Sequence, residues 1–221
     1  MKTVKFFLAV MLVMIGTSAS AQFTSSPRSH ASSKNVNSGW NEFTFDLGYG
    51  QTYYTGDHDI DSEDIWGVSF NYGRGIHLNR SNGLTLRPGT GVLVAYQNTD
   101  GHYDDVNTVV VSITPKVDFG YHFTFPNSSV SLFPYVGLTT RVNVWGQIDY
   151  NDETYDLFDS DEGDANRFQV GGRIGFDAHF NHFVLGFTYE QDFTKFSEYN
   201  YRGFSEDIKI RDINLRLGWC F

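Results

Sequence analysis

The stretch that decides the fold is residues 168–180, which read FQVGGRIGFDAHF. Apolar and polar side chains alternate along it. The apolar face carries Phe168, Val170, Ile174, Phe176, Ala178 and Phe180, and the polar face carries Gln169, Arg173, Asp177 and His179. Because successive side chains of a β-strand point to opposite faces, this alternation predicts a strand with one apolar and one polar side.

The same alternation recurs from residue 42 to the last residue. It predicts strands at Glu42–Thr55, Ile65–Leu78, Leu84–Gln97, Val106–Thr124, Val130–Trp145, Arg167–Phe180, Phe183–Phe196 and Ile208–Phe221. A strand of about 9–11 residues, tilted near 45°, crosses the hydrocarbon core of a bilayer, and every predicted strand is at least that long. The sequence therefore predicts an all-β fold, an eight-stranded antiparallel up-and-down transmembrane β-barrel.

The positions of the glycines indicate which face of the strands lies inside. On the predicted register the polar face carries Gly48, Gly50, Gly67, Gly73, Gly75, Gly89, Gly91, Gly120, Gly137, Gly171, Gly175, Gly186 and Gly218, and Gly172 alone lies opposite. The interior of an eight-stranded barrel is barely wide enough for side chains. Small and polar residues are therefore expected inside, and the apolar rows are expected against lipid. The alternative is a soluble lipocalin-type barrel, in which the apolar face points inward.

The N-terminal segment has the order of an export signal. Lys2 and Lys5 precede an apolar run that ends in small residues at Ala21, which predicts a cleavable signal peptide over residues 1–21. Residues 22–40 are rich in Ser and predict a flexible periplasmic tail. The barrel domain is expected over residues 41–221.

The composition limits the possible partners. The chain has 221 residues and a formal net charge of −10, so nucleic acid is not expected as a partner because its phosphates would be repelled. A single cysteine, Cys220, excludes a disulfide framework. Short connections alternate with long ones, which is the asymmetry of periplasmic turns and outer loops and predicts both termini on the periplasmic side.

The C-terminal residues carry a resemblance to a known family. Ile213, Leu215, Leu217, Trp219 and Phe221 alternate up to a final aromatic residue, and this ending resembles that of small outer-membrane barrels of the OmpA/OmpX type. The resemblance covers residues 42–221 and includes residues 133–138, FPYVGL. It implies integral outer-membrane localisation in a Gram-negative-type cell, and recognition of Trp219 and Phe221 by the barrel assembly machinery. The chain ends at its last strand, so we expect no peptidoglycan-binding domain.

The polar face also carries charges of both signs. The predicted network inside the barrel consists of Glu42, Asp46, Asp118, Asp177, Glu190 and Asp192 with Arg87, Lys116, Arg141, Arg173 and Arg216. Since unpaired buried charges are costly, near-balance predicts an ion-paired plug; the alternative is a path for ions or small solutes. The short turn at Asn181 and His182 predicts that Arg173 faces Glu190.

The long connections are acidic and aromatic. Weak binding of divalent cations is suggested by the acidic residues Asp57, Asp59, Asp61 and Glu63. An EF-hand loop, however, requires Gly at position 62 and Glu at position 68, where this chain has Ser62 and Val68. Aromatic residues among these acids favour an adhesion role or an extracellular partner. A lipid-modifying enzyme using His58, His102, His179 or His182 is the remaining alternative. We find no nucleophile motif, and we expect no enzyme activity, no cofactor and no firm metal site.

Overall fold

The computed structural model describes residues 39–55, 62–78, 83–100, 105–125, 128–150, 153–159, 165–201 and 204–221. The expected signal peptide and nearly all of the expected tail lie outside these ranges. The strands are β1 Trp40–Thr55, β2 Glu63–His77, β3 Leu84–Asp100, β4 Asp105–Ile113, β5 Lys116–Tyr121, β6 Phe123–Thr124, β7 Val130–Tyr150, β8 Glu153–Asp156, β9 Phe168–Phe180, β10 Phe183–Asp192, β11 Ser197–Tyr201 and β12 Phe204–Cys220. In the described part of the chain, no helix is both long and apolar enough to cross a membrane.

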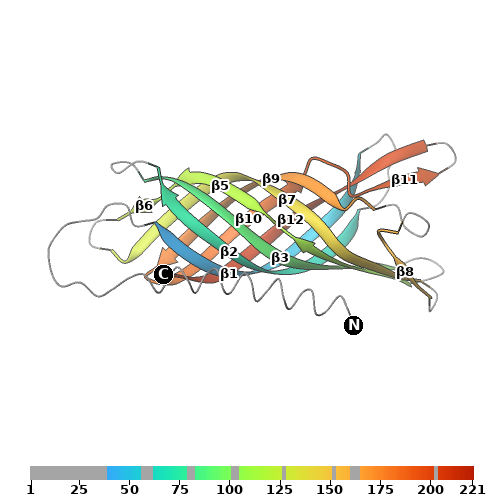
Figure 1. Cartoon of the computed structure of the whole chain (residues 1–221), viewed down its shortest axis with the longest axis horizontal. Coiled ribbons are helices and arrows are strands. Elements are labelled where there is room, and N and C mark those ends of the chain that lie inside the picture. Colours follow the sequence, from blue (N-terminus) through green and yellow to red (C-terminus); the bar gives the residue numbers. More distant parts are fainter. Residues whose placement is uncertain are drawn as a thin grey trace. The chain divides into compact units, whose positions relative to one another are not determined.

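The strands form one antiparallel sheet that closes on itself (Figure 1). β1 pairs with β2 on one side and with β12 on the other, from Glu42 opposite Cys220 to Thr55 opposite Asp207. Around the barrel the order is β1, β2, β3, then β4 with β5 and β6 in line, β7, β9, β10 and β12. The prediction of an eight-stranded antiparallel barrel is confirmed.

The predicted fourth strand is not continuous. It is divided into β4, β5 and β6, with breaks at residues 114–115 and at His122. Pro115 has no backbone N–H to donate to a neighbouring strand, and the pairing of β4 with β7 shifts register between Val111 and Ser112. The alternation of side chains continues across these breaks, and for this reason the sequence pattern did not show them.

Two of the predicted long connections, residues 147–166 and 197–207, contain additional strands. β7 continues to Tyr150 and pairs with β8, and β11 pairs with β12. The predicted seventh strand is also too long, because β10 ends at Asp192 rather than at Phe196. These hairpins lack the apolar face on which the strand predictions depended. They lie at the end of the barrel opposite the C-terminus (Figure 1), called here the long-loop end; the opposite end is the short-turn end.

The two faces of the sheet are segregated as predicted. In β9 the side chains of Phe168 and Ile174 are 56% and 55% exposed, whereas Gln169 and Asp177 are fully buried. At the short-turn end Asn181 adopts φ 57°, a left-handed conformation that Asn tolerates, and the turn aligns Phe180 with Phe183. The apolar rows therefore form the outer surface, and the polar rows fill the lumen.

Glycine is required where side chains cross the lumen. A Cβ at Gly175 would lie 2.4 Å from the Tyr135 ring, and one at Gly186 would overlap the carboxylate of Asp177. Gly172 instead faces outward, beneath the exposed ring of Phe193. The inward glycines thus provide the room in which the large polar side chains of neighbouring strands lie.

Candidate functional site: the charged lumen

Arg87 is one centre of the lumen network. Its Nε and Nη2 donate to Asp118 Oδ2 at 3.0 and 2.9 Å, and its Nη1 donates to Glu42 Oε1 at 2.9 Å and also to Asp177. The guanidinium lies 4.4 Å from the ring centre of Tyr135. β3 thus connects with β1, β5 and β9 through one side chain that is 2% exposed.

Arg216 is the second centre. Its Nε and Nη2 donate to the two oxygens of Asp46 at 3.1 and 3.0 Å, which is the bidentate geometry that a guanidinium favours. Its Nη1 donates to Asp177 Oδ2 and to the Tyr135 hydroxyl, both at 3.3 Å. Asp177 is therefore shared by Arg87 and Arg216, and the two centres form one network.

Arg173 lies beside this network with poorer geometry. Its Nε is 3.3 Å from Glu190 Oε1 and 3.5 Å from Asp118 Oδ1. The structure aligns Arg173 with Glu190, as the turn predicted. None of the three guanidinium nitrogens makes a hydrogen bond to a described residue, although the side chain is fully buried.

Arg141 organises the lumen nearer the long-loop end. It forms an ion pair with Asp212, and its nitrogens lie 3.6 Å from Asp192 and 3.9 Å from Glu190. Asp212 is missing from the sequence-based network, although its alternation with Arg216 places it on the inner face. With Asp212 included, seven carboxylates face five basic side chains, so the balance is less even than the sequence analysis predicted.

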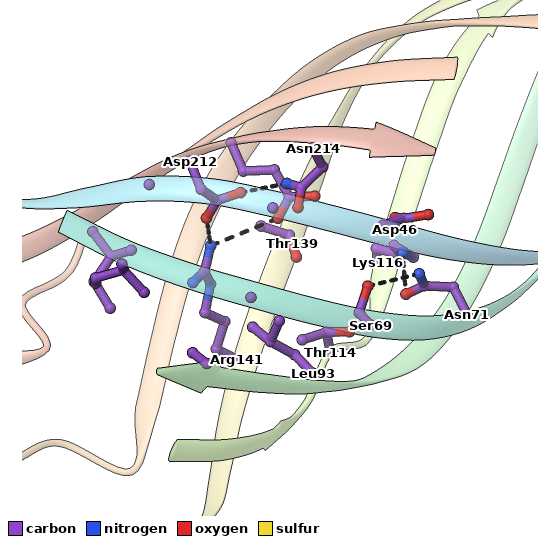
Figure 2. A pocket seen from close by; sticks show the side chains of 17 residues that line it. Asp46, Ser69, Asn71, Leu93, Thr114, Lys116, Thr139, Arg141, Asp212 and Asn214 are labelled. Atoms are coloured by element: carbon purple, nitrogen blue, oxygen red, sulfur yellow. Dashed lines mark hydrogen bonds and ion pairs between the residues drawn. The ribbon is translucent and has the colours of Figure 1, made fainter. Parts of the chain in front are cut away.

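Lys116 is the one basic member of the predicted network that forms no ion pair with the described carboxylates. Its ammonium donates to Asn71 Oδ1 at 2.6 Å. Both residues line two cavities, one of about 40 Å³ toward Arg141 and one of about 10 Å³ beside Arg87. Figure 2 shows Lys116 and Asn71 at one end of the larger cavity, with Arg141 and Asp212 at the other.

Aromatic rings close the short-turn end. Trp40, which precedes the predicted first strand, stacks on His122 with 4.7 Å between ring centres and contacts His179 at 5.3 Å. Its Nε1 donates to Glu42 Oε2 at 2.8 Å. His77 and Phe133 each lie 5.6 Å from the Trp40 ring. This cluster was missed because its members come from five separate segments.

The histidines proposed for catalysis occupy structural positions or fall outside the described residues. His58 and His102 are in the latter group. His179 packs against Trp40, and Nδ1 of His182 lies 3.0 Å from the Cys220 carbonyl oxygen. The structure does bring His122 within 2.9 Å of the Ser131 hydroxyl, a pair that the sequence analysis did not identify.

The acidic loop candidates are only partly described. Asp57, Asp59 and Asp61 lie outside the described residues, and Glu63 is the first residue of β2, where its N–H donates to Thr52. Within the described ranges, no group of three or more His, Cys, Asp or Glu side chains is arranged to hold a metal ion. At the long-loop end, Lys195 donates a hydrogen bond to Glu198, and its ammonium lies 3.3 Å from the Asp207 carboxylate. The hydrogen bond to Glu198 raises the pKa of Lys195.

The predicted assembly residues lie on the outer surface. Trp219 is 53% exposed and stacks on His182, and Phe221 stacks on Phe43 with 5.7 Å between ring centres. The backbone of Phe221 exchanges two hydrogen bonds with Asn41, each 2.9 Å long. The C-terminal strand is thus fully integrated where the barrel closes.

A closed barrel with an apolar exterior and an ion-paired interior defines a β-barrel integral membrane protein. The family model described as "Outer membrane protein beta-barrel domain" matches residues 7–221. The chain belongs to this family and resides in the outer membrane. Among curated proteins, the comparison finds no match.

Several solved structures are similar at low identity. The attachment invasion locus protein Ail of Yersinia pestis, solved with the heparin analogue sucrose octasulfate, is 14% identical, with a TM-score of 0.44 and coverage of 83% of this chain and 99% of Ail. The Neisserial surface protein A is 12% identical, with a TM-score of 0.43 and coverage of 81% and 96%. The outer-membrane enzyme PagL is also 12% identical, with a TM-score of 0.43 and coverage of 79% and 97%.

Proposed function

We propose that this protein is a closed outer-membrane barrel whose activity lies in surface interaction at its long-loop end, and that it is not an open pore. The observation that carries the proposal is the position of Asp177, which accepts hydrogen bonds from both Arg87 and Arg216. These three side chains come from β9, β3 and β12. None of these strands is paired with another of the three, so the hydrogen bonds connect strands that are not neighbours in the sheet.

The energetics of buried charge support a closed state. Arg87, Arg216, Asp118 and Asp177 are each at most 2% exposed. Separating such pairs without water is strongly unfavourable, because each charge would lose its counter-charge inside a low-dielectric lumen. A steadily open path would require several of these pairs to separate together. The network is therefore expected to act as a plug.

The long-loop end supplies the surface on which a partner could bind. There β8 and β11 extend the sheet as hairpins that carry acidic and aromatic residues. Tyr150 is 41% exposed on the strand that pairs with β8. Aromatic side chains provide large contact area and are favoured anchors of interfaces. We propose an adhesion or partner-binding role there, with the rim acids loosely bridged by divalent cations.

We further propose that the protein is not an enzyme. The one close His–Ser pair reported above, His122 with Ser131, lies beside Trp40 at the short-turn end. Ser131 is buried inside the lumen, so a lipid outside the barrel could not reach its hydroxyl. Lipid modification stays the less favoured alternative. Altered acyl chains in outer-membrane lipids when the protein is present, detected by mass spectrometry, would overturn this proposal.

The C-terminal strand supports a proposal for biogenesis. Trp219 and Phe221 are exposed on the lipid side, where an assembly factor could contact them before the barrel closes. We propose that they are recognised by the barrel assembly machinery.

Single-channel recording in planar bilayers tests the closed lumen. The expected result is no steady open level for the unaltered protein, and open events for Asp177→Ala, which removes the shared acceptor. Glu153→Ala, at the long-loop rim, is the matched control and should stay closed. A steady conductance of the unaltered protein would favour the alternative of a narrow pore, for which the cavities on either side of Lys116 would supply part of the path.

A further inference from the structure

The lumen contains a vestibule between the Arg87–Arg216 network and the long-loop end. It consists of two adjoining cavities of about 40 and 30 Å³, which share Ile65, Leu93, Ala95, Arg141 and Ile210 as lining residues. A cavity that holds one water needs about 10–15 Å³. The vestibule therefore has room for several waters or for one small solute.

One wall of this vestibule is apolar. Ile65, Ile210 and Val110 are buried inside the barrel, although they occupy the face that is otherwise polar. Gly67 and Ala95 are paired across β2 and β3 and keep this wall open, since a Cβ at Gly67 would already lie 3.2 Å from Leu93. Apolar walls combined with a few placed polar groups are the usual design of a small-molecule site.

The opposite side of the vestibule is acidic. Glu190, Asp192 and Asp212 surround the single guanidinium of Arg141. The larger cavity is lined by three carboxylates, those of Asp46, Glu190 and Asp212, and by two basic side chains, Lys116 and Arg141. Carboxylates therefore exceed basic groups by one at this cavity.

Two carboxylates have unused acceptor capacity. Glu190 lines the larger cavity, and its nearest basic nitrogens are at 3.3 Å in Arg173 and 3.9 Å in Arg141, without a hydrogen bond among the described residues. Asp192 is 1% exposed, and neither of its oxygens accepts a hydrogen bond from a described residue, but it lines neither cavity. A buried carboxylate without donors is costly. A ligand in the vestibule that brings N–H donors and positive charge would relieve that cost at Glu190.

We propose that the vestibule binds a small primary ammonium compound with a short apolar chain. The ammonium group donates to Glu190, and the chain packs on Ile65, Leu93, Ala95 and Ile210. The ion-paired plug forms the floor, so the site is blind-ended and the bound amine enters and leaves by the long-loop end. An anion of the same size is disfavoured by the excess of carboxylates.

The test measures binding of n-butylammonium to the folded protein in detergent micelles. The readout is the backbone amide NMR shifts of Gly48 and Gly67, with sodium butyrate and n-butanol as probes of equal size and different charge. The expected result is saturable binding of n-butylammonium, at least tenfold tighter than of butyrate or butanol. Equal or tighter binding of butyrate would overturn the proposal, as would the absence of saturable binding.

Two variants locate the site. Glu190→Gln removes the acceptor charge, and Ala95→Leu fills the cavity without changing any charge; each should weaken binding at least tenfold. Asp64→Asn on β2 is the control, because the Asp64 side chain is exposed and accepts hydrogen bonds from Tyr49 and Gln51. This variant removes the same charge and should bind as the unaltered protein does. If Glu190→Gln fails to fold, Ala95→Leu decides alone. Undiminished binding in any folded variant of these two would overturn the proposal.

Discussion

Removing Arg216 should strongly destabilise the barrel. Arg216→Met leaves Asp46, which is 4% exposed, without its bidentate partner and takes one of two donors from Asp177. Breaking a buried ion pair by removing one partner costs about 3–5 kcal/mol. The Arg216→Met barrel should lose stability in that range.

Urea unfolding in lipid vesicles, followed by tryptophan fluorescence, measures this loss. With a slope of about 2 kcal/mol per molar urea, the midpoint should fall by about 1.5–2.5 M. Arg211→Met is the matched control on the same strand, because Arg211 is exposed and, among the described side chains, donates a hydrogen bond only to Gln51, at 3.1 Å. It should change stability by less than about 1 kcal/mol. The double variant Arg216→Met/Asp46→Leu should recover at least half of the loss, since it leaves no unpaired carboxylate at that position. A midpoint shift below that of Arg211→Met would refute the reasoning.

Three other sets of residues can be tested separately: Arg173, the glycines of β9 and the C-terminal aromatic residues. Arg173→Ala should lower the melting temperature in detergent, but by less than Arg216→Met, because the Arg173 guanidinium makes no hydrogen bond to a described residue. An unchanged melting point would count against the plug. Gly175→Val should abolish the heat-modifiable gel band of the folded barrel, because the new Cβ would overlap the buried Tyr135 ring. Gly172→Ala should fold, because its Cβ would displace only the exposed ring of Phe193. Equal folding of the two variants would contradict the assignment of the strand faces. Trp219→Ala/Phe221→Ala should slow insertion in cells while leaving refolding into detergent nearly unchanged, and equal slowing in both settings would argue for a purely structural role.

Alternation along eight segments predicts the barrel, and the positions of the glycines predict which face of its strands points inward. The turn at Asn181 also predicted which residues meet on neighbouring strands, including Arg173 and Glu190. Both inferences depend on local geometry, which repeats every two residues along a strand and reverses at a turn.

Contacts across the lumen could not be predicted in the same way. Asp177 meets Arg87 because of the tilt and closure of the whole sheet, and no short-range pattern encodes that meeting. The packing of Trp40 among histidines from separate strands has the same origin. Asp177 and Arg216, by contrast, both pair with Gly186 of β10. Asp212 is different, because its alternation with Asn214 and Arg216 was visible in the sequence. The strand predicted from Ile208 includes Asp212 on its polar face, although the predicted network does not contain this residue.

The orientation of β9 is the most direct test of the account. Single-cysteine variants at Ile174, Phe176, Gly175 and Gln169, in a Cys220→Ala background, can carry spin labels in lipid nanodiscs, and collision rates with oxygen and with a water-soluble nickel chelate can be compared. Labels at Ile174 and Phe176 should collide preferentially with oxygen, which concentrates in lipid tails. Labels at Gly175 and Gln169 should either prevent folding or be shielded from both reagents. Strong collision of the Ile174 and Phe176 labels with the nickel chelate would contradict a barrel that turns its apolar rows toward lipid and encloses its charges.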